Sequence, residues 1–194
     1  AVPEKGIACG YDTTTALYLS HFDDDRYRVI AEVLGGGYGA GHRNDGVSAV
    51  GGPLANCTNT PVEVLDLDYD FFRMHEYSLR PDSGGGGRQR GGLGYVRAYE
   101  ILKPGASLSM YADRFKLAPE GLFGGQEGKR ARCTVERGGE IIDIPSKGGL
   151  ALEPGDILTI MTGGGAGYGD PEERDPTAIA ADLADGFITR AAAE

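Results

Sequence analysis

The stretch Gly35-Gly36-Gly37-Tyr38-Gly39-Ala40-Gly41 limits how this chain can fold, because five of its seven residues have no side chain. Similar stretches occur at 84–92, 121–125 and 163–169, and the chain holds 33 glycines among 194 residues, more than twice the usual share of ~7%. Clustered glycine lets other backbones approach closely, but it costs conformational entropy on folding. We therefore expect the chain to be part of a larger assembly in which its function resides.

Composition excludes several classes of protein. A length of 194 residues allows one domain, or two small ones, with a real core. No run approaches the ~18 apolar residues of a membrane span, and no signal peptide is recognisable, so we expect a cytoplasmic protein that does not bind membranes. A net charge of −10 argues against nucleic-acid binding. The only concentrated positive charge in the sequence is at Arg88 and Arg90.

The cysteines and histidines do not form a recognisable metal site. Cys9, Cys57 and Cys133 are far apart and contain no Cys-x-x-Cys pair, so we expect small buried residues and no zinc site or disulfide framework. None of the three histidines is paired at ligand spacing. His42 is notable only because it follows directly on the first glycine stretch. We predict no metal bound by this chain.

Short runs of β-branched and aromatic residues, separated by turn signals, predict strands. Residues 26–34 alternate as a strand entering the first glycine stretch. Further strands are predicted at 71–79, 95–102, 107–112, 131–136, 141–144 and 157–161. The pattern is typical of an α+β fold that is predominantly β, with a mixed N-terminal part and a C-terminal part built as a β-sandwich or barrel.

Three segments carry helix-start signals. Asp12-Thr13-Thr14-Thr15 predicts a short helix over 16–19, and Thr60-Pro61 with Glu63 resembles a capping box. Asp175-Pro176-Thr177 predicts a C-terminal helix over 178–183, which Gly186 would end.

We divide the chain into three regions on this basis. They are a glycine-loop region with the candidate site (1–93), a β-rich region (94–170) and a helical tail (171–194), together forming one part of a larger protein.

Nucleotide and nucleophile motifs fail when tested in the first glycine stretch. A phosphate-binding P-loop needs Lys after its second glycine, where this chain has His42. The spacing Gly35-x-Gly37-x-x-Ala40 follows a strand but leads into a turn, without the helix that a dinucleotide site requires. No Gly-x-Ser-x-Gly nucleophile elbow occurs at 46–51.

The segment from 35 to 63 has the density of polar side chains expected of a substrate-binding site. The candidates are Arg43, Asp45, Asn56, Asn59 and Glu63, with Arg88 as a weaker one. Arg43 would hold a carboxylate or a phosphorylated intermediate, and the two asparagines would orient an amide. A purely structural role is equally consistent with the sequence. The asparagines would then make hydrogen bonds within turns, and Glu63 would complete a helix cap. Arg88 would form an ion pair with a partner subunit or lie in a solvated turn. No catalytic residue is identifiable.

Several motifs in this order resemble the hydantoinase B/oxoprolinase family across nearly the whole chain. They are GGGYGA (35–40) with DGVSAV (45–50), TNTPVEVL (58–65), LRPDSGGGGR (79–88) with RGGLG (90–94), ADRF (112–115) with PEGLFGG (119–125), and GGGAGYGDP (163–171) with RDP (174–176). One departure is the segment 51–55, GGPLA, where family members usually have a His-containing stretch.

The resemblance implies that the chain corresponds to the C-terminal portion of a longer B component. Such components work with an ATP-binding A component to open cyclic amides such as hydantoins, 5-oxoproline or lactams, and related complexes carboxylate ketones. ATP and Mg are thus expected on the partner, and the metal ligands of B components belong to the N-terminal half, so none is carried over.

The implied partners are the A component and the N-terminal B portion, in a hetero-oligomer that acts on a small-molecule substrate. The isolated chain is expected to be inactive. Three alternatives stay open: a subunit of a ketone carboxylase, a non-catalytic structural subunit, and an independent carbohydrate-binding β domain, which the absence of Trp disfavours.

Overall fold

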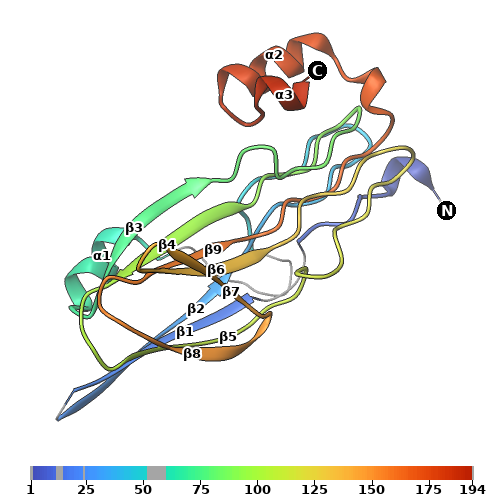
Figure 1. Cartoon of the computed structure of the whole chain (residues 1–194). Coiled ribbons are helices and arrows are strands. Elements are labelled where there is room, and N and C mark those ends of the chain that lie inside the picture. The colour runs from blue at the N-terminus through green and yellow to red at the C-terminus, as the bar shows by residue number, and fades with distance from the viewer. Residues whose placement is uncertain (1, 12–14, 24, 52–59, 194) are drawn as a thin grey trace.

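The fold is predominantly β with a few short helices, which confirms the predicted class (Figure 1). The structure is a computed structural model that describes residues 2–11, 15–23, 25–51 and 60–193. The strands are β1 (Thr15–Asp23), β2 (Arg26–Leu34), β3 (Phe72–Leu79), β4 (Tyr95–Ile101), β5 (Ala106–Tyr111), β6 (Arg132–Arg137), β7 (Glu140–Ile144), β8 (Lys147–Leu152) and β9 (Ile157–Met161). The helical segments are η1 (Pro3–Lys5), α1 (Val62–Asp68), η2 (Pro171–Glu173), α2 (Pro176–Ala184) and α3 (Arg190–Ala193).

Two antiparallel sheets form a sandwich. One has the strand order β2-β1-β5-β8 and the other β3-β4-β9-β6-β7. Their inner faces share one hydrophobic core, in which Leu17 and Leu19 of β1 belong to the same cluster as Tyr99 of β4 and Leu158 of β9. The two sheets form a β-sandwich, as predicted, but the sandwich is not confined to the C-terminal part. Each sheet includes at least one strand that precedes residue 93 and others that follow it.

Three local predictions were wrong. Residues 16–19 lie in β1 instead of a helix, because alternate residues such as Leu17 and Leu19 are needed in the core. No strand was predicted between 144 and 157, but Lys147–Leu152 form β8, which pairs with β5. Helix α1 has no capping box: Pro61 occupies its N-cap and no side chain caps it.

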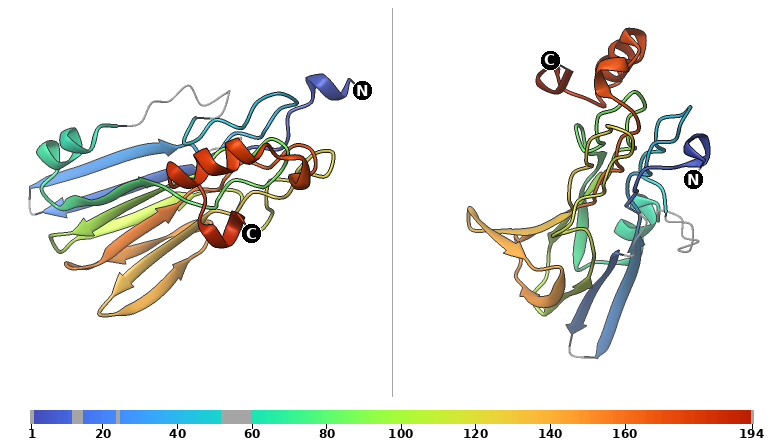
Figure 2. Two further views of the ribbon diagram at one scale, coloured as in Figure 1. Left: turned by 90° about the horizontal axis from the view of Figure 1, so that it is seen from above. Right: turned by 90° about the vertical axis from the view of Figure 1, so that its right-hand side faces the viewer.

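The glycine stretches lie side by side as a hydrogen-bonded bundle beyond the ends of the sheets, in the close backbone approach expected of clustered glycine (Figures 1 and 2). Backbone N–H groups along 163–169 turn successively to three neighbouring segments. The donor–acceptor pairs are Gly164 to Lys129, Gly165 to Gly92, Ala166 to Cys9, Gly167 to Gln126 and Tyr168 to Gln89, at 2.8 to 3.1 Å. From Gly164 to Tyr168 the neighbouring segment repeats after three residues, which is the period of a polyproline II helix, whereas Gly169 departs from this order and donates to Leu122.

Glycine is required in this bundle because the backbones are in direct contact. A Cβ built on Gly165 would lie 1.9 Å from the Tyr38 carbonyl oxygen, and one built on Gly164 would lie 1.8 Å from that of Ser83. Neither distance leaves room for a side chain. We refer to these extended segments, at 6–11, 35–51, 83–94, 119–130 and 162–169, as the glycine bundle.

The helical tail begins as predicted. The Asp175 side chain accepts a hydrogen bond from the Thr177 N–H and caps α2, and Gly186 follows the helix with φ of 71°. Helices α2 and α3 lie at the end of the glycine bundle farthest from the sheets (Figure 1). No helix among the described residues is long and apolar enough to cross a membrane.

Candidate functional site

A hollow of about 360 Å³ lies between the turn that follows the first glycine stretch and the N-terminal segment. Arg43 and Asp45 line it together with His42, Glu4 and Lys5. Two of the predicted site residues therefore share a concave surface, and Arg43 is exposed on it. Side chains of both signs line the hollow, which suits a small polar molecule better than an apolar one.

Asp45 is held by protein groups on both carboxylate oxygens. Arg174 donates to Oδ1 at 2.9 Å and to Oδ2 at 2.8 Å, and the Arg90 backbone N–H donates to Oδ1 at 2.7 Å. Burial alone would raise the pKa of Asp45, but the hydrogen bonds and positive charge of Arg174, with those of Arg90, outweigh it and lower the pKa. Asp45 is thus an ionised anchor for the helical tail.

A buried ion cluster continues from Asp45 into α2. Arg90 forks onto Asp182 with Nε–Oδ2 and Nη2–Oδ1 distances of 3.1 and 3.2 Å, and Arg174 reaches the same carboxylate at 2.6 Å. The side chains of Arg90, Arg174 and Asp182 are each less than 10% exposed. Arg90 therefore binds a carboxylate of its own chain. Sequence spacing does not connect Arg90 with Arg174 or Asp182, because both lie more than 80 residues away from it.

Arg88 lies at the edge of the same region. Its Nη1 is 3.2 Å from a carboxylate oxygen of Glu173, its Nη2 is 3.5 Å from Nδ1 of His42, and its guanidinium lies 5.9 Å from the centre of the Tyr168 ring. The structure thus brings Arg88 beside His42, next to the hollow that holds Arg43.

Glu63 is not brought together with these predicted site residues. Asn56 and Asn59 lie outside the described residues. Glu63 is exposed on α1, which packs beside β3, whereas the hollow belongs to the glycine bundle at the other end of the molecule (Figure 1).

Sequence reasoning missed a buried arginine next to Thr60. Arg97 on β4 is fully buried, pairs with Glu32 of β2 at 2.9 Å and donates to the Thr60 carbonyl at 3.0 Å. Tyr99 also donates to Glu32, and burial raises the pKa of Tyr99 well above its usual value. Nε and Nη1 of Arg97 have no hydrogen-bond partner among the residues that the structure describes. Strand alternation at 95–102 does not distinguish such an arginine from an exposed one.

A second hollow corrects the view that positive charge is concentrated only at Arg88 and Arg90. About 660 Å³ in volume, it is lined by Arg80, Lys129, Arg130 and Arg132 with the carboxylates of Glu127 and Asp143. Arg80 donates from Nη1 to the carbonyls of Arg130 and Thr162, at 2.7 and 3.0 Å. Burial and the nearby Arg132 lower the pKa of Arg80.

Within the described ranges, no three His, Cys, Asp or Glu side chains are grouped closely enough to hold a metal ion.

The sequence pattern of the hydantoinase B/oxoprolinase family matches residues 1–171. An uncharacterized protein of Methanocaldococcus jannaschii is 43% identical over 81% of this chain and 28% of its own length. The 5-oxoprolinase 1 of Arabidopsis thaliana is 37% identical over 76% of this chain and 12% of its own length.

Two solved structures have the same fold. An ATP-dependent caprolactamase from Pseudomonas jessenii superposes with a TM-score of 0.85 at 27% identity, over 100% of this chain and 35% of the caprolactamase chain. A nucleotide-free acetone carboxylase has a TM-score of 0.79 at 18% identity over 98% of this chain and 30% of its own, which shows a shared fold alone. The chain spans about a third or less of the length of these proteins. Because the pattern of the hydantoinase B/oxoprolinase family matches 171 of its residues, this chain belongs to that family.

Proposed function

We propose that this chain is the C-terminal portion of the B component of an ATP-dependent amidohydrolase that opens a cyclic amide. The observation that carries the proposal is the match of the whole chain to a caprolactamase at 27% identity, beside 37% identity to a 5-oxoprolinase. Caprolactam and 5-oxoproline are both cyclic amides, so a lactam or hydantoin ring is the substrate class.

The nucleotide and its Mg would bind to an A component, and any metal ion would bind to the rest of the B component. ATP would supply phosphorylation of the amide oxygen, which makes the ring carbon open to attack by water. The cell compartment would be the cytoplasm.

Arg43 is the substrate-binding residue that we propose in the 360 Å³ hollow. It is exposed there, whereas Asp45 is engaged by Arg174 and Arg90. A guanidinium at this position would hold the carboxylate of a substrate or a phosphorylated intermediate. Asp45 and Arg88 would then shape the hollow, the one by fixing the turn and the other by holding His42.

The test uses the native protein purified from its own source with every associated chain. ATP hydrolysis is measured with hydantoin, 5-oxoproline and caprolactam, and separately with acetone plus bicarbonate. We expect at least a tenfold stimulation by one cyclic amide, together with the ring-opened product. Stimulation only by the ketone with bicarbonate would favour the carboxylase alternative instead.

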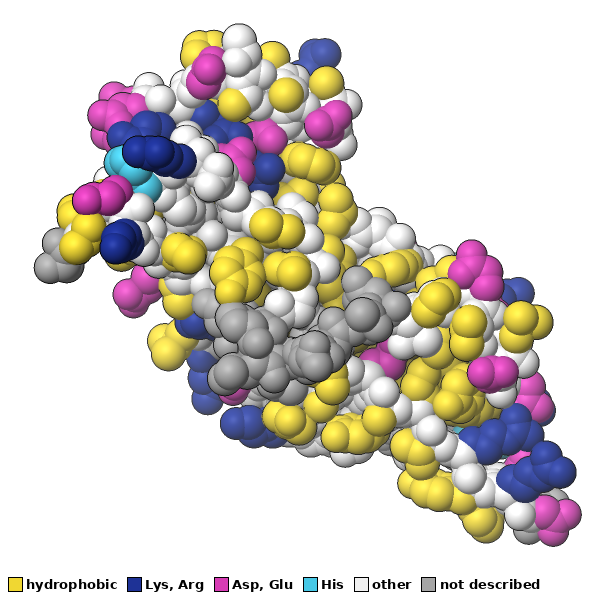
Figure 3. Space-filling model, turned by 180° about the vertical axis from the view of Figure 1, so that it is seen from behind, with side chains coloured by type: hydrophobic (Ala, Val, Ile, Leu, Met, Phe, Trp, Pro, Cys, Tyr) yellow, Lys and Arg dark blue, Asp and Glu magenta, His cyan; other side chains and the backbone are white. Residues whose placement is uncertain are grey.

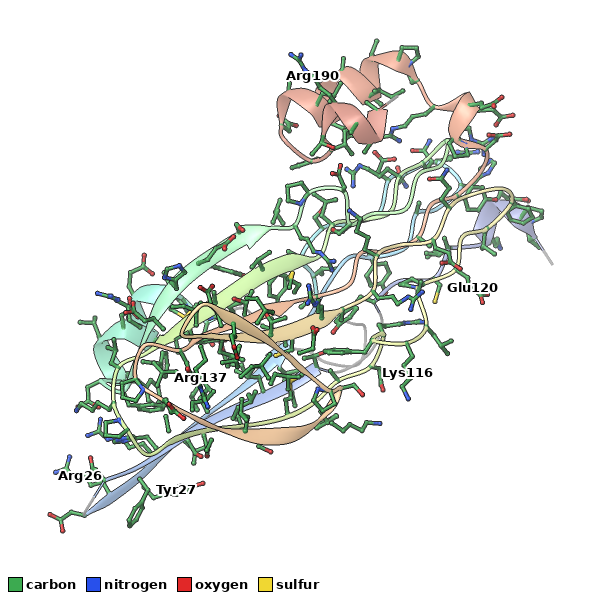
Figure 4. The ribbon with its side chains drawn as sticks, in the orientation of Figure 1. Arg26, Tyr27, Lys116, Glu120, Arg137 and Arg190 are labelled. Atoms are coloured by element: carbon green, nitrogen blue, oxygen red, sulfur yellow. The ribbon has the colours of Figure 1, made fainter. Side chains whose placement is uncertain are left out.

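Arg43→Ala then tests the site. We expect KM for the cyclic amide to rise at least tenfold while the native mass stays that of the wild type. Arg190→Ala is the matched control, because Arg190 is an exposed arginine on α3 (Figure 4). If Arg43→Ala alters assembly and leaves KM unchanged, a structural role replaces the substrate-binding one.

A further inference from the structure

The outer face of the β2-β1-β5-β8 sheet is nearly free of charge. Strand alternation and the cross-strand register place fourteen residues on it. They are Ala16, Tyr18, Ser20 and Phe22 of β1, Tyr27, Val29, Ala31 and Val33 of β2, Ser107, Ser109 and Tyr111 of β5, and Lys147, Gly149 and Ala151 of β8. Lys147, at the rim, is the one charged residue among them. We call these fourteen residues the outer face.

Contacts within the sheet confirm that these residues share one side. Ser20 and Ser107, which are register partners on β1 and β5, are hydrogen-bonded through their hydroxyl oxygens at 2.7 Å. Their neighbours along β1, Leu19 and His21, are buried on the opposite side, so the alternation is maintained.

Large apolar side chains on the outer face are open to solvent. Phe22 and Tyr27 are 64% and 68% exposed, and Tyr18, Val29, Val33 and Tyr111 are each between 38% and 44% exposed. Hydrophobic side chains gather along the lower half of the molecule in Figure 3, and Tyr27 points away from the sandwich in Figure 4. An antiparallel sheet with one solvated face normally carries polar residues there. A contiguous exposed apolar patch instead marks an interaction surface.

The described helices do not cover this surface. Helix α1 packs beside β3 of the other sheet, and α2 packs with α3 beyond the glycine bundle (Figure 2). The chain as a whole carries a net charge of −10, so an uncharged surface of this breadth selects for a partner surface that is also apolar and uncharged.

We infer that the outer face is the docking surface for the part of the B-type protein that lies outside this chain. The length of the caprolactamase argues for this occupant. All of this chain superposes on only 35% of the caprolactamase chain, so nearly two thirds of that protein has no counterpart in this chain. A portion of that size needs an apolar contact with this one, and the outer face offers it. The inference rests on the proposed function for the identity of the partner.

Hydroxyl-radical footprinting of the native protein tests the inference, because the outer face carries four aromatic reporters, Tyr18, Phe22, Tyr27 and Tyr111. Fully buried Tyr99 sets the lower limit of reactivity, and the same peptides in urea set the upper one. We expect the four reporters to react at least fivefold more slowly than in urea, close to Tyr99. Reactivity near the urea rate would overturn the inference.

A photo-crosslinker in place of Tyr18 identifies the occupant. We expect crosslinks to B-type residues outside this chain. Crosslinks to a second copy of this chain, or to an ATP-binding chain, would overturn the choice of occupant.

A charge on the outer face should block docking. Val29 lies midway along the edge strand β2 and belongs to the outer face, so Val29→Lys places a charge there. Ile141→Lys, 56% exposed on the edge strand β7 of the other sheet, is the matched control. We expect Val29→Lys to lower the yield of assembled protein at least tenfold and Ile141→Lys to leave it unchanged; equal yields would refute the docking role. Protection of the reporters in a preparation without cyclic-amide activity would refute the proposed function and leave the docking surface intact.

Discussion

Replacing one Cα hydrogen of Gly165 with the methyl group of alanine tests whether direct backbone contact stabilises the glycine bundle. In Gly165→Ala the new Cβ would lie 1.9 Å from the Tyr38 carbonyl oxygen, whereas ordinary contact begins at 3.4 Å, so the segments must separate by about 1.5 Å. Three hydrogen bonds of 2.8 Å are affected: Gly165 to Gly92, Gly85 to Gly165, and Gly92 to Tyr38.

The expected cost follows from these contacts. Each weakened hydrogen bond is worth about 1 kcal/mol net, and overpacking adds about 1–3 kcal/mol. Alanine also lowers the conformational entropy of the unfolded chain, which offsets about 0.4–1 kcal/mol of this loss in stability. We therefore expect Gly165→Ala to lower the free energy of unfolding by about 3–5 kcal/mol, which for a chain of this size lowers Tm by roughly 10 °C.

The assay is thermal unfolding followed by circular dichroism and by tyrosine fluorescence, since the chain has no Trp. Gly41→Ala is the matched control: its Cβ would meet nothing nearer than the Asn44 carbonyl oxygen at 4.0 Å, and its φ is not positive. It should change stability by less than about 1 kcal/mol. If the two variants have the same Tm within about 2 °C, the backbone contacts do not carry the stability of the bundle.

Two further predictions concern ionisable groups. Because the pKa of Asp45 is lowered in the folded chain, its stabilising effect is present above the unfolded pKa of ~3.9 and is lost as the pH falls through the folded value. Tm should therefore fall between pH 5 and pH 3, and Asp45→Asn should have a lower Tm at pH 6 but a shallower fall; an equal slope in both proteins would contradict this role. Burial raises the pKa of Cys133 to about 12, so its thiol should stay unlabelled by iodoacetamide at pH 8 while half-buried Cys9 is modified. Peptide mass spectrometry compares the two sites, and rapid labelling of Cys133 in the folded chain would show that the core around it opens.

The sequence predicted the strands whose pattern is local. Residues 26–34 form β2 with the predicted bounds, and Asp175 caps α2 because an N-cap depends on its own few neighbours. Strand β8 was missed because its glycines resemble a turn, and only pairing with β5 holds them extended. The local sequence pattern of 147–152 contains no information on its pairing with β5.

The candidate site was predicted only where it is continuous in sequence. Arg43 and Asp45 share a hollow because they share one turn. Arg174, by contrast, meets Asp45 across 129 residues, and Arg97 meets Glu32 across two strands of different sheets. These pairs depend on how the bundle and the sandwich are assembled.

The glycine bundle and the sandwich also differ in the surface that each would expose on unfolding. The sandwich core consists of leucine, isoleucine and aromatic side chains, whereas the bundle is joined mainly through its peptide groups. Exposing apolar surface raises the heat capacity of the unfolded chain, and exposing polar surface lowers it. The stability of the bundle therefore depends less on temperature than that of the sandwich. Cooling weakens the hydrophobic packing between the sheets more than it weakens the backbone hydrogen bonds between the glycine segments.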